Sequence, residues 1–317
     1  MWVSFFKAVR AFIPINIGVR VLVKFRIGIS QRIFRFFSIH WPVSGEVKFE
    51  LPLGEKIKLY SKTDDYISTQ VFWHGYKGYE GASIELFYYL SKKSSVILDI
   101  GANVGYYALV AAISNSKSIV HAFEPVARIY ERLNLNIGIN NLSNVFTVCS
   151  VVGNSVEPVK FYLPKVDGMV LASSTKKGWA SNAEEILVPS VSLDIYKNKA
   201  GISKMDLIKM DCEFHEIEVL NGMKRILQED GPIILIEVLF PEGEGQKGHF
   251  EMETHFEIER IMKENGYYFY LICSNALIRM DALEYNPDER NYLFSKRCSE
   301  KRYLSFSEME LLIKSIS

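Results

Sequence analysis

The fold is decided by residues 96–125, which read VILDIGANVGYYALVAAISNSKSIVHAFEP. The stretch opens with a short apolar run that ends in Asp99. Gly101 and Gly105 then bracket a turn, and residues 106–113 are apolar enough for a buried helix. The order of strand, glycine turn and helix predicts the first half of a βαβ unit, with a parallel strand to follow.

A second strand is predicted at residues 118–123, and it ends in another acid, Glu124, twenty-three residues beyond Gly101. Parallel strands joined by a helix bring Asp99 and Glu124 to neighbouring carboxyl ends, the edge at which open α/β sheets bind ligands. Gly101 and Gly105 can take positive φ, which lets the backbone approach a ligand closely. One carboxylate can therefore face the glycine turn and the other a ribose.

The spacing of this turn argues against a pyrophosphate ligand. A dinucleotide fingerprint would need glycines where Asn103 and Tyr106 stand, and an acid ahead of the first glycine is a poor neighbour for phosphate. Carboxylates at both strand ends suit a cationic ligand that also carries a ribose. S-adenosylmethionine, with its sulfonium, ammonium group and ribose, is such a ligand. The structural alternative is an ordinary βαβ unit with solvated acids at its strand ends.

Length and composition indicate one main catalytic domain with an N-terminal extension. The chain has 317 residues, and α/β domains of about 200 to 250 residues are common. Hydrophobic residues make up 48% of the chain, which is enough for a real core, and Lys+Arg and Asp+Glu balance at 37 each. This balance argues against a nucleic-acid-binding protein. We expect a basic amphipathic arm at residues 1–45, a small β and helical cap at 46–95, an S-adenosylmethionine-binding domain at 96–300 and a C-terminal tail at 301–317.

The N-terminal arm is basic. Residues 1–40 contain seven Lys or Arg and no acid. The longest uncharged run, residues 11–19, is too short to span a bilayer, and the absence of a small-residue cleavage site argues against a signal peptide. Residues 19–37 form a basic amphipathic stretch that can lie on an anionic membrane surface. The alternative is that the arm packs on the catalytic domain or on a second copy of the chain in a homo-oligomer.

The cysteines and histidines indicate the compartment and argue against a zinc site. The four cysteines, at 149, 212, 273 and 298, form no CxxC pair, so reduced thiols are expected. Reduced thiols favour the cytoplasm, with peripheral contact to the inner face of the membrane through residues 1–40. The six histidines show no HExxH or comparable ligand spacing, so a zinc site has no support.

A second informative stretch is residues 205–223, MDLIKMDCEFHEIEVLNGM. It predicts a buried strand that closes on Asp211, followed by a helix. Glu213 and His215 lie between the two elements, so titratable groups gather at one strand end beside the predicted cofactor. A carboxylate and an imidazole there could take a proton from a hydroxyl. Acids such as Glu216 have a structural alternative, because the dipole of a helix favours acids at its N-terminus.

Three further residues are candidates because of their positions. Glu80 precedes a predicted helix and could reach the cofactor, and the alternative is a structural corner of the chain. The strand predicted at residues 144–150 should end near the adenine ring, where Ser150 or a backbone amide could pair with the base edge. Glu237 interrupts the apolar strand GPIILIEVLF at residues 231–240, and a charge in such a run must face a cavity or an ionic partner.

Taken together, five segments make the chain similar to FkbM-type S-adenosylmethionine-dependent methyltransferases. The resemblance covers about residues 64–297, and it is carried by VILDIGANVGYYALVAA, HAFEP, SLD at 192–194, DLIKMDCEFHEIEVLNG and IILIE. It implies a Rossmann-like class I methyltransferase sheet of seven strands, with helices on both faces and the last strand antiparallel. Members of this family are similar to one another in methylating hydroxyl groups, often on sugars, glycan precursors or polyketide-like metabolites.

The resemblance also implies roles for individual residues. The cofactor would contact the first motif, the ribose-binding acid and its neighbour, namely Asp99, Gly101, Asn103, Gly105, Glu124 and Pro125. Asp211, Glu213 and Glu216 match an acidic D-x-E-G-x-E pattern in which Phe214 replaces the usual glycine. We expect this replacement to narrow the backbone freedom of the turn and to place an aromatic wall in the acceptor site. Asp211 is expected to contact both cofactor and acceptor.

We therefore predict an S-adenosylmethionine-dependent O-methyltransferase acting on a hydroxyl of a sugar, glycan precursor or related metabolite. Asp211 is the first choice for orienting or deprotonating the acceptor, followed by Glu213 and His215. A divalent metal bridging Asp211 and Glu213 to a sugar diol is a variant without sequence support. Two alternatives stay open. One is an NAD-dependent oxidoreductase on a Rossmann sheet, and the other is a non-catalytic, membrane-associated scaffold with a methyltransferase fold.

Overall fold

The computed structural model describes residues 43–164, 183–238, 246–274, 276–284, 286, 289–297, 301 and 303–308. Nearly all of the basic arm predicted at residues 1–45 lies outside these ranges. The chain divides into two compact units, with a boundary between Glu80 and Gly81, and the functional domain bounds expected from the sequence stay a prediction. Helix α5 (Gly81–Ser91) belongs to the second unit because it packs on that unit's helix α6 (Tyr106–Ser114).

The first unit is built on a β-hairpin. Strands β1 (Ser44–Glu50) and β2 (Lys56–Lys62) pair antiparallel, and their apolar residues alternate with polar ones, so that one face of the hairpin is buried. Helix α4 (Tyr66–His74) packs against both strands. It begins at Asp65, whose side chain accepts a 2.6 Å hydrogen bond from the Ser68 amide, and the short helix η1 (Tyr76–Gly78) follows it.

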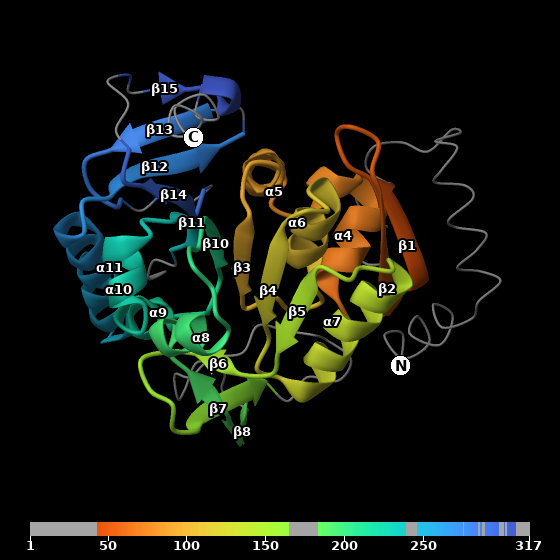
Figure 1. The fold of residues 1–317 in the computed structure, drawn as a ribbon, viewed down its shortest axis with the longest axis horizontal. Coiled ribbons are helices and arrows are strands. Elements are labelled where there is room, and N and C mark those ends of the chain that lie inside the picture. Colours follow the sequence, from red (N-terminus) through yellow and green to blue (C-terminus); the bar gives the residue numbers. More distant parts are fainter. Residues whose placement is uncertain are drawn as a thin grey trace. The chain divides into compact units, whose positions relative to one another are not determined.

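The second unit is organised around a mixed sheet, which has nine strands within the described residues (Figure 1). Its order is β5-β4-β3-β10-β11-β14-β12-β13-β15. The five strands from β5 to β11 are parallel, and β14 runs antiparallel between β11 and β12. The bounds are β3 (Val96–Ile100), β4 (Ile119–Phe123), β5 (Val145–Val148), β10 (Leu207–Met210), β11 (Ile233–Glu237), β12 (Tyr268–Cys273), β13 (Ala276–Met280), β14 (Asn291–Ser295) and β15 (Tyr303–Leu304).

This sheet confirms the predicted α/β class, with a Rossmann-like parallel half and an antiparallel strand near the C-terminus. The predicted number of seven strands was wrong. Strand β13 adds to the sheet as the second strand of a hairpin with β12, and β15 pairs with β13 at the outer edge. The resemblance covered only the common seven strands, and these two additions depend on pairing between segments that are too short to stand out in the sequence.

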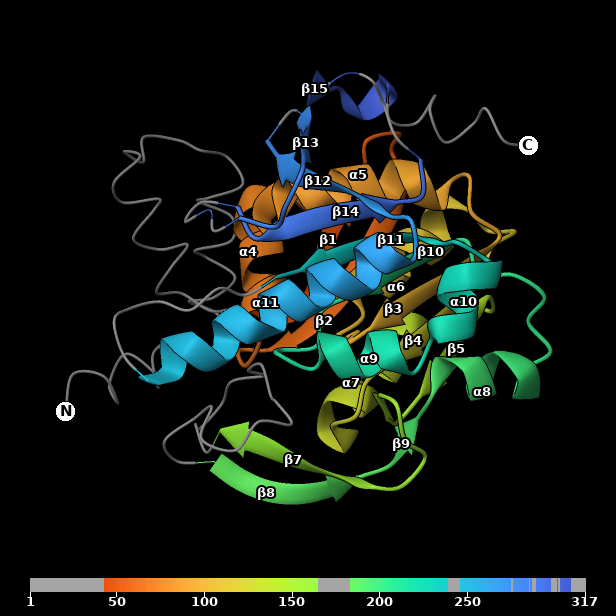
Figure 2. The same ribbon diagram turned by 90° about the vertical axis from the view of Figure 1, so that its left-hand side faces the viewer.

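Helices cover both faces of the sheet (Figures 1 and 2). On one face, α6 packs on β3 and β4, and α5 packs on α6 and β12. On the other face lie the helices that follow β10 and β11, namely α9 (Glu216–Asn221), α10 (Lys224–Glu229) and α11 (Gln246–Glu264). Two more helices flank the sheet: α7 (Ala127–Ile139) contacts β5, and α8 (Leu193–Lys199) contacts α10.

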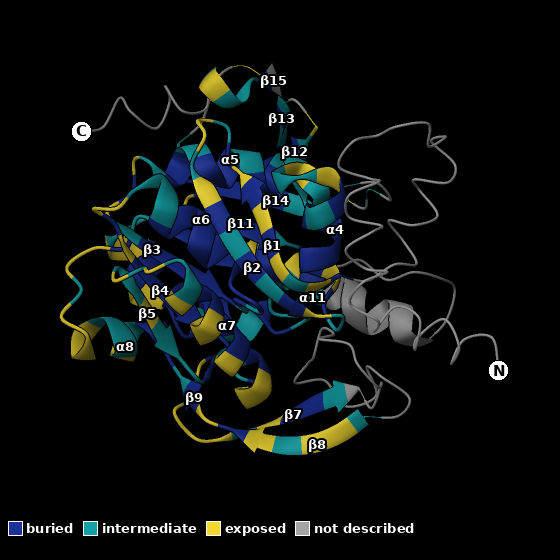
Figure 3. Ribbon diagram, turned by 90° about the vertical axis from the view of Figure 1, so that its right-hand side faces the viewer, coloured by how far each residue is buried: buried dark blue, intermediate teal, exposed yellow. Residues whose placement is uncertain are grey.

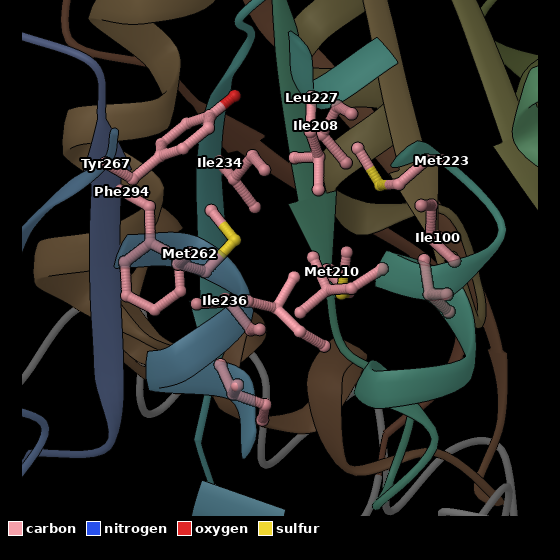
Figure 4. Close-up of a cluster of buried hydrophobic side chains, with 14 of the residues drawn as sticks. Ile100, Ile208, Met210, Met223, Leu227, Ile234, Ile236, Met262, Tyr267 and Phe294 are labelled. Atoms are coloured by element: carbon pink, nitrogen blue, oxygen red, sulfur yellow. The ribbon is translucent and has the colours of Figure 1, made fainter. Parts of the chain in front are cut away.

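The main apolar core lies between the sheet and α9–α11. Alternate residues of β3, β10 and β11 point to this side, where they meet side chains such as Met223 and Leu227 from the α9–α10 region and Met262 from α11 (Figure 4). The strand residues are Leu98, Ile100, Ile208, Met210, Ile234 and Ile236. Because side chains alternate along a strand, Asp99 and Lys209 must point to the opposite face.

Two small two-stranded sheets complete the described part of the second unit. Strand β6 (Val151–Val152) pairs parallel with β9 (Ser190–Val191), and β7 (Val159–Pro164) pairs antiparallel with β8 (Ala183–Val188). Much of β8 is exposed (Figure 3).

Cys149, Cys212 and Cys273 carry free thiols, as expected. No helix among the described residues is both long and apolar enough to cross a bilayer.

The SLD triplet at residues 192–194 has a structural role. The Asp194 carboxylate accepts hydrogen bonds from the Arg225 and Ile226 amides, both at 3.1 Å, in the first turn of α10. The Ser192 hydroxyl donates to the Gly222 carbonyl oxygen at 2.8 Å. The triplet therefore joins the start of α8 to the start of α10.

Replacing Asp194 by alanine should lower the free energy of unfolding by about 1 kcal/mol, because two amides at a helix N-terminus lose their acceptor. Urea denaturation followed by circular dichroism measures the change. Asp194→Asn keeps one acceptor oxygen and should lose less. Equal stability of the alanine variant and the wild type would show that the triplet does not hold α10.

Candidate functional site

The candidate site lies where β3, β4, β10 and β11 end. The glycine turn after β3 is tied to the end of β4, because the Gly101 and Ala102 amides donate to the Phe123 carbonyl oxygen at 3.0 and 2.9 Å. Gly101 has φ +79°, and a Cβ added there would lie 1.9 Å from the carbonyl oxygen of Asp211. A side chain is therefore excluded, and glycine allows the ends of β3 and β10 to come together.

The two acids predicted at the strand ends are both buried and both serve the glycine turn. Asp99 Oδ2 accepts a 2.8 Å hydrogen bond from the Ala108 amide in the first turns of α6. Glu124 accepts from the Asn103 amide at 3.0 Å through Oε2 and from the Val126 amide at 2.9 Å through Oε1. Glu124 thus holds the turn itself through the Asn103 amide, and Asp99 holds the helix that follows the turn.

Burial controls the charge of Glu124. It raises the pKa of this carboxyl to about 7, while the Val126 and Asn103 amides partly offset that rise and the Asp99 charge adds to it. A donor group from a ligand would favour the ionised form further. Glu124 is therefore poised to lose its proton when a hydroxyl-bearing ligand binds.

Asn103 and Gly105 complete the turn. Asn103 has a left-handed φ of +49°, and its Oδ1 atom is buried with no hydrogen-bond partner among the described residues. Gly105 begins helix α6 with φ +91°, and a Cβ there would meet the Leu133 side chain at 2.5 Å. A buried acceptor without a partner is uncommon, so Asn103 Oδ1 fits a donor supplied by a ligand.

The Ser150 groups that were predicted to contact adenine already have hydrogen-bond partners within the protein. The Ser150 hydroxyl lies 2.9 Å from the Pro189 carbonyl oxygen, and its amide donates to the Val148 carbonyl oxygen at 3.1 Å. The Pro125 carbonyl oxygen is 3.8 Å from Cys149 Sγ. Ser150 could therefore offer a base edge little more than the remaining lone pairs of its oxygen. Glu80 belongs to the first unit, where it has φ +45°, and its cofactor contact stays a prediction.

Asp211 meets a second acid at the ends of β10 and β11. Its amide donates to the Ile100 carbonyl oxygen at 3.1 Å, and its side chain is 22% exposed. Carboxylate oxygens of Asp211 and Glu237 lie within 4.8 Å of each other. The sequence indicated that Glu237 faces a cavity or an ionic partner, and the structure places it beside the first-choice catalytic acid.

Lys209 was missed by the sequence reasoning. It lies in β10, an inner strand of the sheet, is 1% exposed, and its Nζ atom is 3.8 Å from Asp211 Oδ2. The sequence did carry a sign of this residue. A single lysine in the apolar strand LIKM calls for the same reasoning that singled out Glu237 in β11.

The turn after Asp211 contains two consecutive residues in the left-handed region. Glu213 has φ +48° and Phe214 has φ +72°. Phe214 therefore adopts the backbone conformation for which the family pattern uses glycine. Glu216 is buried, and its Oε1 atom accepts from the Phe214 amide at 3.2 Å. The Glu216 carboxylate thus helps to hold this turn, and Glu216 is the first residue of α9.

His215 packs at a different place from the two acids that meet at the strand ends. Its buried ring lies against Gly153, where an added Cβ would be 3.1 Å from Nε2, and its Nδ1 atom is 3.4 Å from the Glu218 carboxylate. The structure thus brings Asp211 and Glu237 together, and it gives His215 contacts of its own in the α9 region. The role of His215 as a base stays a prediction.

The sequence of this chain matches a known protein family. The model of the methyltransferase FkbM domain matches residues 99–269, from the end of β3 into β12. The chain belongs to the FkbM methyltransferase family. The family resemblance inferred from the motifs is thereby confirmed, and this FkbM methyltransferase uses S-adenosylmethionine as its cofactor.

Individual relatives of this FkbM methyltransferase are distant. Methyltransferase sdnD of Sordaria araneosa is 23% identical over 228 residues, covering 63% of this chain and 81% of that protein. Hexuronic acid methyltransferase AglP of Haloferax volcanii is 26% identical over 152 residues, covering 46% of this chain and 56% of that protein. The crystal structure of methyltransferase FkbM from Methylobacillus flagellatus KT matches with 16% identity and a TM-score of 0.39, covering 64% of this chain and 43% of that one. The match to AglP thus spans little more than half of its length.

The residues of the glycine turn fit the cofactor. Glu124 can accept hydrogen bonds from ribose hydroxyls through the lone pairs that its two amide partners leave free. Asn103 Oδ1 is a buried acceptor without a protein donor. Gly101 keeps the turn free of side-chain atoms where β3 meets β10. In this FkbM methyltransferase, these three residues would hold the cofactor. Asp99 of β3 accepts from the Ala108 amide of α6, and its own contact with the cofactor stays a prediction.

The backbone strain at Phe214 gives a prediction about stability. A residue with a Cβ costs roughly 1–2 kcal/mol in the left-handed region, and glycine avoids that cost. Phe214→Ala and Phe214→Gly both remove the ring, so they differ mainly in this backbone cost. We expect the glycine variant to be more stable than the alanine variant by about 1 kcal/mol in urea denaturation. Equal stability of the two would show that the turn is not strained.

The buried acids give a pH prediction. Burial raises the pKa of both Glu124 and Glu216 to about 7, against an ordinary value of 4.5. Between these two pKa values the folded protein keeps protons that the unfolded chain releases. The contribution of these two groups to the free energy of unfolding is therefore greatest below about pH 4.5, and it is lost as pH rises through 7. Each group should account for about 3 kcal/mol of this loss.

Glu216→Gln removes one of these titrations and keeps an acceptor oxygen for the Phe214 amide. Urea denaturation between pH 5 and pH 8 should show a shallower fall in the free energy of unfolding for this variant than for the wild type. Glu131→Gln, at an exposed position on α7, is the matched control and should keep the wild-type slope. An unchanged slope in Glu216→Gln would contradict a raised pKa at this site.

Proposed function

We propose that this FkbM methyltransferase transfers a methyl group to a hydroxyl oxygen of a sugar or glycan precursor. The proposal is carried by the pairing of Asp211 and Glu237, whose carboxylate oxygens lie within 4.8 Å of each other at the ends of β10 and β11. A glycan acceptor is supported by the match to AglP, which is named as a hexuronic acid methyltransferase.

The chemistry requires positioning and one proton acceptor. S-adenosylmethionine supplies an activated methyl group on a sulfonium, so the chain must hold the acceptor oxygen in line with it and remove a proton. The bond from sulfur to the methyl carbon breaks as the oxygen–methyl bond forms, and the hydroxyl proton passes to a carboxylate. Asp211, partly exposed at 22%, is the first choice for this base, and we infer that the neighbouring Glu237 orients the same hydroxyl.

The acids also favour a hydroxyl over a carboxylate as the acceptor group. Two carboxylates at the acceptor edge repel an anion, and they attract the proton of a neutral hydroxyl. If the acceptor is a uronic acid, its own carboxylate should therefore face away from Asp211 and Glu237. The product is then a methyl ether rather than a methyl ester.

The alternatives from other classes have less support. An NAD-dependent oxidoreductase would need the glycine spacing that residues 101–106 lack, and the family match runs through this stretch. A scaffold that uses the basic arm would have no need for an unpartnered acceptor at Asn103 beside the buried carboxylate of Glu124. Peripheral membrane contact through residues 1–40 stays a prediction, because these residues lie outside the described ranges.

The test combines calorimetry with product analysis. We expect S-adenosylmethionine to bind the wild type and NAD not to bind. Glu124→Ala should weaken cofactor binding at least tenfold, because the buried acceptor for the ribose is lost, whereas Glu131→Ala should leave it unchanged. Binding of NAD in preference to S-adenosylmethionine would overturn the assignment.

Product analysis tests the acceptor. Neutral and uronic acid oligosaccharides are incubated with the enzyme and S-adenosylmethionine, and mass spectrometry should detect a gain of about 14 Da per methyl group. The gain should survive mild alkali, which cleaves esters and spares ethers. Asp211→Asn should lower kcat by about 100-fold or more. An alkali-labile product would show that the acceptor group is a carboxylate.

A further inference from the structure

Lys209 lies directly beneath the acidic edge of the site. In the sheet it is in register with Asp99 of β3 on one side and Leu235 of β11 on the other. Asp211 is two residues further along the chain, so the two side chains point to the same face of the sheet. The lysine thus occupies the row below Asp211 and Glu237, on the face that α6 covers.

Among the described residues, an acid, an amide and an aromatic ring lie around the lysine ammonium. Its Nζ atom is 3.8 Å from Asp211 Oδ2, 3.5 Å from Asn291 Oδ1 and 4.9 Å from the centroid of the Tyr107 ring. The Tyr107 ring is in turn held by the Phe87 ring, with centroids 5.0 Å apart in an edge-on arrangement. An aromatic face on one side and polar oxygens on the other leave a buried ammonium little freedom.

Burying this charge is costly, and packing alone does not account for it. Moving an ammonium out of water carries a large desolvation penalty, and a well-packed apolar side chain often gives equal or greater stability at such a position. Two carboxylates at the ends of β10 and β11 also repel each other unless a positive charge lies nearby. The positive charge of Lys209 below the two carboxylates reduces this repulsion.

We propose that Lys209 is a positioning residue that holds Asp211 through Oδ2, so that the other carboxylate oxygen, Oδ1, faces the acceptor hydroxyl. This inference rests on the proposed hydroxyl methylation. In this arrangement the ammonium does not touch the acceptor. It fixes the orientation of the base and offsets the repulsion between Asp211 and Glu237.

The chain offers a matched control for a buried lysine. Lys197 of α8 pairs with Asp230 at 2.5 Å, and these side chains are only 12% and 5% exposed. Asp230 also accepts from the Met205 amide at 2.9 Å, just before β10, which places this pair at the amino ends of the strands. Loss of this pair should affect stability and should leave the acceptor edge untouched.

The first experiment compares Lys209→Met with Lys197→Met at a temperature at which both variants are folded. With the oligosaccharide that the wild type methylates, Lys209→Met should lower kcat at least tenfold and change the Kd for S-adenosylmethionine less than twofold, because a misplaced base slows only the chemical step. Lys197→Met should keep the wild-type kcat. A wild-type kcat in Lys209→Met, or an equal loss in both variants, would overturn the proposal.

A double-mutant cycle tests whether Lys209 acts through Asp211. In an Asp211→Asn background, Lys209→Met should cause no further loss of kcat, whereas independent losses that multiply would overturn the proposal. The same four proteins in urea denaturation should show coupling between the two residues, and no acceptor is needed for that measurement. If no sugar is methylated, the proposed function fails, and the urea cycle still decides whether Lys209 and Asp211 act as a pair.

Two further variants keep the test decisive if Lys209→Met does not fold. Lys209→Arg retains the positive charge and should retain more activity than Lys209→Gln at equal cofactor occupancy. Tyr107→Leu leaves the lysine in place and removes the aromatic face that holds it, so kcat should fall while the Kd for S-adenosylmethionine stays within about twofold. Equal activity of the Arg and Gln variants, or a wild-type kcat in Tyr107→Leu, would contradict a role for the fixed charge.

Discussion

The close approach of Gly101 to the Asp211 carbonyl oxygen is the constraint on which the candidate site depends. A Cβ at Gly101 would lie 1.9 Å from that oxygen, so the ends of β3 and β10 can meet only because this position has no side chain. The contact joins the turn that carries Asn103 to the strand end that carries Asp211. The turn predicted to bind the cofactor and the strand end proposed to bind the acceptor are thereby adjacent, as a direct transfer between two bound molecules requires.

Local sequence patterns were sufficient for the parts of the site that follow from one strand and one turn. Asp99 is the last residue but one of β3 and Glu124 directly follows β4, so both lie next to the glycine turn. The sequence could not show that the Ser150 hydroxyl lies against the Pro189 carbonyl oxygen, because that contact joins segments 39 residues apart. The sequence carried a sign of Lys209 as a charge in an apolar strand, but it could not show that Tyr107 of α6 and Asn291 of β14 surround its ammonium, because only the folded sheet brings these elements together.

At Phe214 the chain keeps the left-handed backbone conformation of the family pattern, although the glycine of that pattern is replaced by phenylalanine. The backbone retains φ +72°, which glycine would adopt without strain. The Glu216 carboxylate helps to hold this conformation, since it accepts from the Phe214 amide. The backbone preference of glycine is therefore lost at this position, and the hydrogen bond to Glu216 helps to stabilise the turn instead. Such strain tends to occur at functional sites, where the surrounding packing fixes the geometry.

The antiparallel direction of β14 has a consequence for how the protein matures during synthesis. Because β14 runs against its neighbours, its first residue, Asn291, reaches the ligand edge and lies opposite Glu237. A nascent chain that has emerged only as far as β12 already contains the residues of the glycine turn, yet β11 still has an open edge where β14 will insert. Until that strand arrives, the growing polypeptide exposes an apolar strand to other chains, so a chaperone would be most useful in this interval.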